Sequence, residues 1–228
     1  MTEMVRTELS EKGYQVIANV LTTEECDGLI RRLSQPDVKR SKAGARHLMS
    51  IPEVAKLAGD HRLADVARAA LGADPVAFRA TLFEKSQQAN WLVVWHQDTA
   101  LPLQQRFDAP GWGPWSIKAG IHYAHAPDWA LSRVVALRAH LDESSSENGP
   151  LRVLPGSHRF GVLADEAVYR LPDEIPETQC LVGKAGVLVM RPLIVHSSAK
   201  STAAVLRRVL HIEYADSMLR REIGLAVA

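Results

Sequence analysis

The sequence predicts a mainly β domain with flanking helices, of the sandwich or barrel type. Helical periodicity is confined to the part before about residue 75, whereas later segments are short, β-rich and separated by turns. Such runs of short strands favour a sandwich or barrel over a doubly wound sheet, and no G-x-G-x-x-G or P-loop pattern is present. With 228 residues, 46% of them hydrophobic, the chain suits one domain. We expect a single domain over 1–228, with a helical part over about 1–75 and a β core over about 76–215.

The helical part contains a short strand, predicted from the segment GYQVIANV at Gly13–Val20. A helix follows, because Thr22 and Glu25 have the spacing of a capping box. Its apolar residues recur at helical spacing and are Cys26, Leu29, Ile30 and Leu33. A shorter helix is expected near Pro52–Ala58, and a further helix should end at Gly72.

The β core is predicted from segments rich in β-branched and aromatic residues. Turns such as Asn148-Gly149 and Pro155-Gly156 separate them. The candidate strands are Val76–Glu84, Trp91–Asp98, Val134–Asp142, Leu151–Leu154, Gly186–Met190, Leu193–Ser197 and Arg208–Tyr214. We expect these strands to form the sandwich or barrel.

The stretch 99–133 differs from the rest of the β core. It is rich in proline, glycine and aromatic residues, among them Trp112 and Trp115. Long connections inside compact domains are often lids or binding loops, which makes this stretch a lid-like insert. The alternative is a packed surface excursion that the tryptophans anchor.

Composition excludes several classes of partner. The formal net charge is +1 and no long block of like charge occurs, so there is no reason to expect binding of nucleic acid or of an anionic membrane. No stretch reaches the roughly 18 consecutive apolar residues of a membrane span, and the N-terminus lacks the apolar core of a signal peptide. Cys26 and Cys180 match no zinc-ligand spacing. We expect a cytoplasmic protein with a small-molecule substrate and no obligate protein partner.

The strongest local signal for chemistry is WHQD, from Trp95 to Asp98. Side chains at i and i+2 of a strand point to the same face, so His96 and Asp98 would project side by side. One imidazole and one carboxylate are two legs of the 2-His-1-carboxylate triad found in non-haem Fe(II) oxygenases. The alternative is a structural histidine beside a surface aspartate, since H-x-D also occurs by chance.

A third ligand and an anion clamp are predicted nearer the end of the chain. His196 ends the apolar run VLVMRPLIVH and would by itself also suit a core position. Arg207 follows eleven positions later, and a strand–loop–strand return would bring the two side chains together. A guanidinium offers a carboxylate paired N–H donors in a fixed fork. Alternation points Arg207 inward and its apolar neighbours toward the helices; reversed facing would make Arg208 the clamp.

Together, WHQD, the segment NGPLRVLPGSH at Asn148–His158, His196 and Arg207 resemble the phytanoyl-CoA dioxygenase family of Fe(II)/2-oxoglutarate oxygenases. The resemblance implies a double-stranded β-helix (jelly-roll) core with helices packed on one sheet. It also implies a set of site residues. These are the iron ligands His96, Asp98 and His196, and the 2-oxoglutarate contacts Arg207, Ser198 and Thr81.

The activity implied by the resemblance is hydroxylation of a small molecule with Fe(II), 2-oxoglutarate and O₂, releasing succinate and CO₂. Related halogenases carry a small residue in place of the carboxylate ligand, whereas this chain has Asp98, which favours hydroxylation. One alternative is a cupin-type metal dioxygenase without 2-oxoglutarate, which would not need Arg207. Another is a non-catalytic binding protein on the same fold, which the presence of all three ligands disfavours.

Three residues are candidate substrate contacts. Arg138 shares a strand face with His140, and a buried arginine is rare unless it is paired. It would contact an anionic substrate or the co-substrate, or else form a salt bridge to Asp142 or another acid. Trp112 and His122 lie in the stretch 99–133, where His122 would flank the entrance or else be a solvent-exposed loop histidine.

Overall fold

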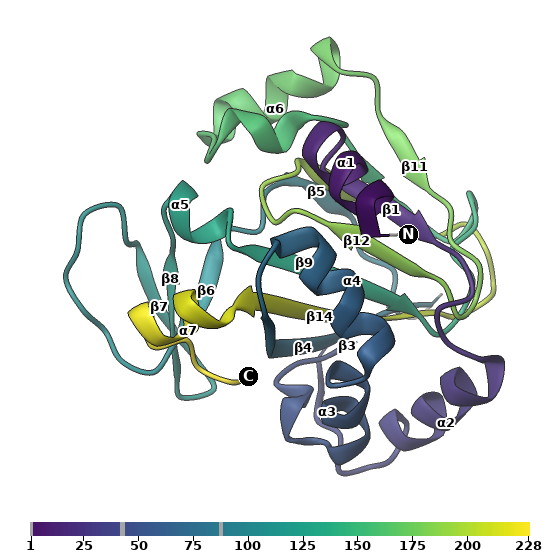
Figure 1. The fold of residues 1–228 in the computed structure, drawn as a ribbon. Coiled ribbons are helices and arrows are strands. Elements are labelled where there is room, and N and C mark those ends of the chain that lie inside the picture. Colours follow the sequence, from purple (N-terminus) through teal and green to yellow (C-terminus); the bar gives the residue numbers. More distant parts are fainter. Residues whose placement is uncertain (1, 42–43, 87–88) are drawn as a thin grey trace.

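Two antiparallel sheets form the body of the molecule in a computed structural model, which describes residues 2–41, 44–86 and 89–228 (Figure 1). The main sheet has the strand order β1 (Tyr14–Ile17), β12 (Val187–Met190), β9 (Val134–His140), β14 (Arg207–Asp216), β4 (Pro75–Lys85), β3 (Gly44–Ala45) and β2 (Arg40–Ser41). The second sheet has the order β11 (Thr178–Cys180), β10 (Leu151–Val153), β13 (His196–Ser198) and β5 (Val93–His96). The predicted mainly β architecture with flanking helices is confirmed.

Helices of the N-terminal part cover one face of the main sheet. They are α1 (Thr2–Glu11), α2 (Thr23–Leu33), α3 (Pro52–Ala58) and α4 (His61–Leu71). Leu63 and Val66 of α4 share an apolar cluster with Leu210 and Ile212 of β14. Tyr214 lies in the same cluster and donates a hydrogen bond from its hydroxyl to the carbonyl oxygen of Ala58 at 3.0 Å. The apolar face of β14 therefore meets the helices, as alternation along the strand predicts.

The other face of the main sheet packs against the second sheet. Ala136 and Leu188 of the main sheet meet Leu151 and Val153 of the second sheet in a buried apolar cluster. Arg207 emerges from the same inner face of β14 and lines a cavity beside this cluster. The space between the sheets is thus apolar at one end and lined by charged side chains at the other.

The local signals in the helical part act as expected. The Thr22 hydroxyl accepts from the Glu25 N–H, and the Glu25 carboxylate accepts from the Thr22 N–H, which completes the capping box of α2. Helix α4 ends at Gly72, whose φ of 68° places it in the left-handed region that favours glycine. Helix α3 has the predicted bounds, Pro52–Ala58.

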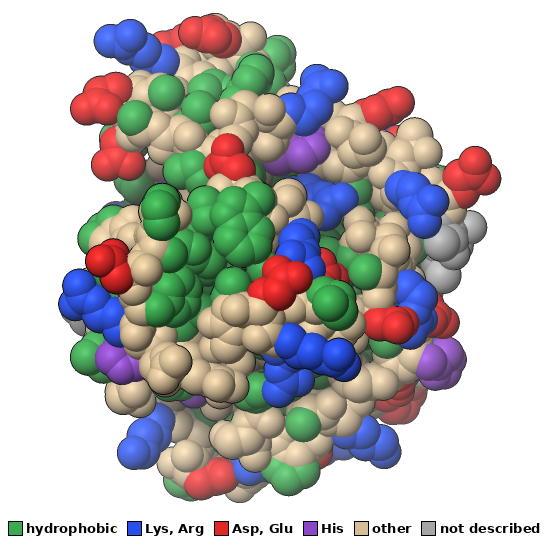
Figure 2. All heavy atoms as spheres, turned by 60° about the vertical axis from the view of Figure 1, so that its left-hand side comes forward, with side chains coloured by type: hydrophobic (Ala, Val, Ile, Leu, Met, Phe, Trp, Pro, Cys, Tyr) green, Lys and Arg blue, Asp and Glu red, His purple; other side chains and the backbone are tan. Residues whose placement is uncertain are grey.

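The stretch 99–133 folds into a sheet of its own instead of a long loop. Its strands have the order β6 (Ala100–Leu103), β8 (Ile121–His125) and β7 (Trp115–Lys118), and the short helix α5 (Asp128–Leu131) follows. The rings of Trp112 and Trp115 pack edge-on against Phe107, with centroids 5.1 and 5.3 Å away. When this side of the molecule is turned forward, apolar side chains are seen to gather on it (Figure 2). Trp112 and Trp115 also pack against a buried apolar cluster that includes Phe78 and Ala215 of the main sheet.

Several elements were not predicted from the sequence. They are α1, α6 (Asp165–Glu174), α7 (Ser217–Ile223), the short strands β2, β3 and β11, and the 3-10 turns η1 (Leu48–Ser50) and η2 (Ser157–Phe160). Helix α6 contains Pro172 and has no side-chain hydrogen bond at its N-cap, Ala164, so neither of the usual helix signals marks it. Among the described residues, no helix is long and apolar enough to span a bilayer.

Two strand predictions near the site are corrected at their ends. The strand predicted over Trp91–Asp98 stops at His96, and the one predicted over Leu193–Ser197 starts at His196. Irregular backbone follows His96, and a turn precedes His196. Asp98 still holds a backbone hydrogen bond, because its N–H donates to the carbonyl oxygen of Pro192 at 3.0 Å.

Candidate metal centre

Two neighbouring strands bring the candidate histidine ligands together. Strands β5 and β13 are antiparallel, and His96 lies directly opposite His196 in their register. Side chains of directly opposed residues sit on the same face of a sheet. The two imidazole rings accordingly lie with their centroids 4.2 Å apart.

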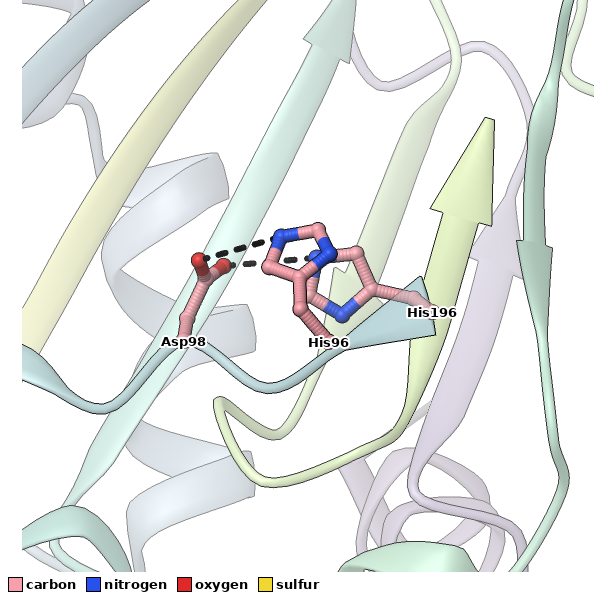
Figure 3. Close-up of side chains that lie close together, drawn as sticks. All are labelled: His96, Asp98 and His196. Carbon is pink, nitrogen blue, oxygen red and sulfur yellow. Dashed lines mark ion pairs between the residues drawn. The ribbon is translucent and has the colours of Figure 1, made fainter. Parts of the chain in front are cut away.

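Asp98 reaches the same point from the turn that follows β5. Its carboxylate oxygens lie 3.8 Å from Nε2 of His96 and 3.6 Å from Nε2 of His196. Candidate ligand atoms of the three residues all lie within 4.8 Å of one another (Figure 3). The structure therefore gathers the three side chains that the sequence singled out.

Backbone contacts select the tautomer that both histidines need as ligands. Nδ1 of His96 lies 2.8 Å from the carbonyl oxygen of Val94, and Nδ1 of His196 lies 2.8 Å from that of Ile194. A carbonyl oxygen only accepts, so each Nδ1 carries the proton and each Nε2 keeps its lone pair. A hydrogen bond at the other ring nitrogen is the usual support for a metal-bound histidine. The donor set thus fits a metal of the non-haem iron type, with two neutral imidazoles and one carboxylate.

The charge states favour metal binding as well. Burial disfavours protonation of His196, and neighbouring His96 adds to this effect, so the pKa of His196 falls to about 3. Burial works against ionisation of Asp98, but interactions with His196, His96, His211 and Arg79 outweigh it and lower the pKa of Asp98. His196 and Asp98 therefore offer unprotonated ligand atoms near neutral pH.

Gln97 faces away from the triad and holds the turn in place. Its side-chain amide donates to the carbonyl oxygens of Gly161 at 2.8 Å and Leu193 at 2.7 Å. Its side-chain oxygen accepts from the N–H of Leu163 at 2.8 Å. These contacts tie the segment between His96 and Asp98 to two other loops.

A small cavity of about 80 Å³ adjoins the triad and holds an excess of positive charge. Lys85, Arg138 and Arg207 line it, and the carboxylate of Asp98 supplies the one acidic group among the described lining residues. Arg207 is 3% exposed, and its Nε has no hydrogen-bond partner among the described residues. Burial, reinforced by Arg138, lowers the pKa of Arg207 to about 9. A buried guanidinium without an acid is expected where a ligand brings the negative charge.

Lys85 and Ser198 form the side of this cavity next to Arg207. Lys85 pairs with Arg207 in the register of β4 and β14, and its ammonium donates to Oγ of Ser198 at 2.6 Å. The Ser198 hydroxyl in turn donates to the carbonyl oxygen of Gly149 at 2.8 Å. Burial, and then the charge of Arg207, lowers the pKa of Lys85 to about 7. Sequence reasoning missed Lys85, although alternation along β4 places it on the same face as Thr81.

Arg138 belongs to the cavity rather than to a salt bridge with Asp142. Its guanidinium lies 3.1 Å from Nδ1 of His211 and 5.2 Å from the centre of the Phe83 ring. Asp142 instead binds Arg208, with the closest atoms 2.7 Å apart. The alternative of an Arg138–Asp142 pair is therefore wrong. The same contact identifies Arg208 as the outward-facing arginine of its pair with Arg207.

A larger cavity of about 290 Å³ lies on another side of Asp98. It is lined by Arg46, His47, Arg79, Thr81, Phe83, Gln97, Asp98, Thr99, Ala100, Lys118, Tyr123, His125, His211 and Glu213. Thr81 thus faces this cavity and not the small one around Arg207. Neither cavity is lined by Trp112 or His122 among its described residues. Trp112 packs on Trp129, at 6.2 Å between ring centroids, and the alternate residues Tyr123 and His125 of β8 reach the cavity in place of His122.

Comparison with known proteins agrees with this geometry. Residues 9–209 match the phytanoyl-CoA dioxygenase (PhyH) family. An L-proline trans-4-hydroxylase of Streptomyces griseoviridis is 31% identical over 163 residues, covering 60% of this chain and 52% of that protein. An ectoine dioxygenase of Sphingopyxis alaskensis is 32% identical over 108 residues, covering 47% of this chain and 28% of that protein. The chain therefore matches about half or less of the length of these relatives.

A solved structure has a similar fold. HygX from Streptomyces hygroscopicus, solved with nickel and 2-oxoglutarate bound, superposes with a TM-score of 0.69 at 18% identity. The match covers 95% of this chain and 88% of HygX. The expected jelly-roll core with helices on one sheet is confirmed, and the family match extends over most of the sequence. The chain belongs to the phytanoyl-CoA dioxygenase (PhyH) family.

Proposed function

We propose that the chain is an Fe(II)- and 2-oxoglutarate-dependent oxygenase that hydroxylates a small molecule and releases succinate and CO₂. The observation that carries this proposal is the small cavity beside the triad, in which Asp98 is the one acid that Lys85, Arg138 and Arg207 face among the described lining residues. A dicarboxylate supplies the negative charge that these cations lack. The names of the relatives support the proposal, since one is a hydroxylase and the other a dioxygenase.

Each residue has a specific task in this proposal. His96, Asp98 and His196 would hold the iron through two Nε2 atoms and a carboxylate oxygen. Arg207 would bind a carboxylate of 2-oxoglutarate through its paired N–H donors. Iron, with 2-oxoglutarate and O₂, supplies the oxidising chemistry when all are bound.

Ser198 and Lys85 would complete the co-substrate contact. The Lys85 ammonium already donates to Ser198 and to the carbonyl oxygens of Ser198 and Ala199. These contacts hold it beside Arg207 without neutralising its charge. A dicarboxylate that enters the cavity therefore meets donors fixed in advance, which reduces the entropy lost on binding.

The proposal is tested by anaerobic titration of the purified protein with Fe(II) and 2-oxoglutarate. We expect one equivalent of each to bind, with 2-oxoglutarate changing the visible absorption of the iron complex. Arg207→Ala should weaken 2-oxoglutarate binding far more than iron binding. Arg208→Ala is the matched control, because it removes the neighbouring cation that Asp142 already neutralises. The proposal fails if 2-oxoglutarate gives no spectral or calorimetric response in the presence of iron.

A further inference from the structure

The larger cavity beside Asp98 is polar and charged almost throughout. Among its described lining residues, only Phe83 and Ala100 lack a polar side-chain atom. An acyl chain in this space would separate the remaining side chains from water without offering them hydrogen bonds, which is unfavourable. The cavity therefore suits a small polar molecule and not a long hydrocarbon.

One pair of charges in this cavity neutralises itself. Arg79 donates two hydrogen bonds to the carboxylate of Glu213, one of them at 2.6 Å through an Nη atom. Nε2 of His211 lies 3.7 Å from the same carboxylate. Burial disfavours the charge of both residues. The attraction between Arg79 and Glu213 is stronger than this effect, so the pKa of Glu213 is lowered and that of Arg79 is raised. Glu213 is thus committed to Arg79 and does not await a cationic ligand.

Two further cations line the cavity without an acid. Arg46 follows β3, and Lys118 ends β7 at the tip of the β7–β8 hairpin. No described residue forms an ion pair with either of them. Lys118 lies 5.2 Å from the centre of the Tyr123 ring. Burial, and then Arg46 and Arg79, lowers the pKa of Lys118, which shows that the three positive groups act on one another.

Arg46 and Lys118 lie at the boundary between two cavities. Arg46, His47 and Lys118 line both the cavity beside Asp98 and an adjoining one of about 680 Å³. Nδ1 of His47 is buried and has no hydrogen-bond partner among the described residues. An unsatisfied ring nitrogen beside two unpaired cations is explained by a ligand that supplies the missing polar atoms. The cavity that Arg46, His47 and Lys118 line is also lined by Asp98, which belongs to the candidate metal centre.

The geometry points to a substrate that is a small polar molecule with an oxyanion group, a carboxylate or a phosphate, held by Arg46 and Lys118. This inference rests on the proposed function, because only an oxygenase would use the bound molecule as its substrate. The rest of the molecule would share the cavity with Asp98, Thr99 and Tyr123, which also line it. An ammonium group is not required by the cavity, because its acids already have roles: Glu213 pairs with Arg79, and Asp98 belongs to the candidate metal centre.

Binding of matched three-carbon probes tests the inference. The probes are glycerate, glycerol 3-phosphate, uncharged glycerol and 3-amino-1,2-propanediol, titrated calorimetrically into anaerobic protein saturated with Fe(II) and 2-oxoglutarate. We expect at least one of the two anions to bind, and neither the uncharged nor the cationic probe. The anion that binds tells a carboxylate site from a phosphate site.

A pair of double variants assigns the binding to the proposed residues. Arg46→Ala with Lys118→Ala should weaken binding of the anion at least tenfold, because two charge-assisted contacts are lost. Arg31→Ala with Lys56→Ala removes two exposed cations that do not line the cavity and should bind the anion as the wild type does. Failure of both anions to bind, equal binding of the cationic probe, or unchanged binding in the first double variant would overturn the inference.

The same samples separate this inference from the proposed function. Titration with 2-oxoglutarate should give the same affinity in the wild type and in the Arg46→Ala, Lys118→Ala variant. If 2-oxoglutarate binds but no anionic probe does, the inference fails and the proposed function stands. If an anion binds through Arg46 and Lys118 but 2-oxoglutarate does not bind, the proposed function fails and the anion site stands.

Discussion

Replacing Arg207 by methionine should stabilise the ligand-free protein, although most substitutions of buried residues destabilise. The guanidinium is 3% exposed, and its Nε lacks a partner among the described residues. Burial and neighbouring Arg138 lower its pKa from 12.5 to about 9. One pKa unit corresponds to about 1.4 kcal/mol, so the charge costs the empty fold on the order of a few kcal/mol before relaxation. Methionine fills a similar volume without a charge and adapts to irregular space.

The expected gain follows from replacements of buried charges by apolar residues. Such replacements are often neutral or stabilising by about 1–4 kcal/mol. For a chain of this size, 1 kcal/mol shifts Tm by about 2–4 °C. We therefore expect Arg207→Met to raise Tm of the metal-free protein by a few degrees in a buffer without oxyanions, measured by circular dichroism. Addition of 2-oxoglutarate to the iron-loaded protein should then stabilise the wild type but not the variant.

Arg208→Met is the matched control and should shift Tm in the other direction. Arg208 is partly buried and binds Asp142, with the closest atoms 2.7 Å apart. Loss of a partly exposed ion pair of this kind costs up to about 1 kcal/mol. If both variants lose stability to the same extent, Arg207 has a partner in the empty protein. The view of the small cavity as a prepared anion site would then be wrong.

Three further predictions concern the pH dependence, the metal and a helix end. The pKa of Lys85 is about 7 in the fold against 10.5 in the unfolded chain, so the unfolded chain binds more protons between these values and stability should rise with pH across that window. Lys85→Met should flatten this rise in chemical denaturation of metal-free protein, and an unchanged slope would assign the titration elsewhere. Asp98→Ala should weaken iron binding and abolish hydroxylation but keep the far-ultraviolet spectrum; retained turnover would show that another carboxylate serves. Gly72→Ala, at φ 68° with open space around its Cβ, should cost about 1 kcal/mol, and a neutral effect would mean that the helix end rearranges.

Two of the three triad residues could be found from the sequence because their signal is local. His96 and Asp98 are two residues apart, so any extended backbone places them on one side. His196 needed more, since its place opposite His96 depends on the pairing of β5 with β13. The register between two distant strands cannot be recognised in the sequence of either strand. The family resemblance therefore supplied the assignment of His196.

Most of the residues that sequence reasoning missed are brought together by contacts between distant segments of the chain. Arg46, Lys118 and Tyr123 meet only because the stretch 99–133 forms a hairpin that reaches β3 and the turn after it. The strands of this insert are short and flanked by proline and glycine, so they resemble loop sequence. Lys85 was within reach of sequence reasoning, because it alternates with Thr81 along a strand that was predicted almost to its last residue.

The partners of the buried cations distinguish structural charges from charges that await a ligand. Strand β14 carries both kinds: Glu213 neutralises Arg79 across the sheet, whereas no described acid neutralises Arg207. A buried ion pair satisfies its own charges, so the pair needs no ligand to be tolerated in the fold. An unpaired buried cation is costly unless it gains a counter-charge from outside. The same strand therefore builds the wall of one cavity from completed pairs and leaves the other cavity with a positive charge for an anion to neutralise.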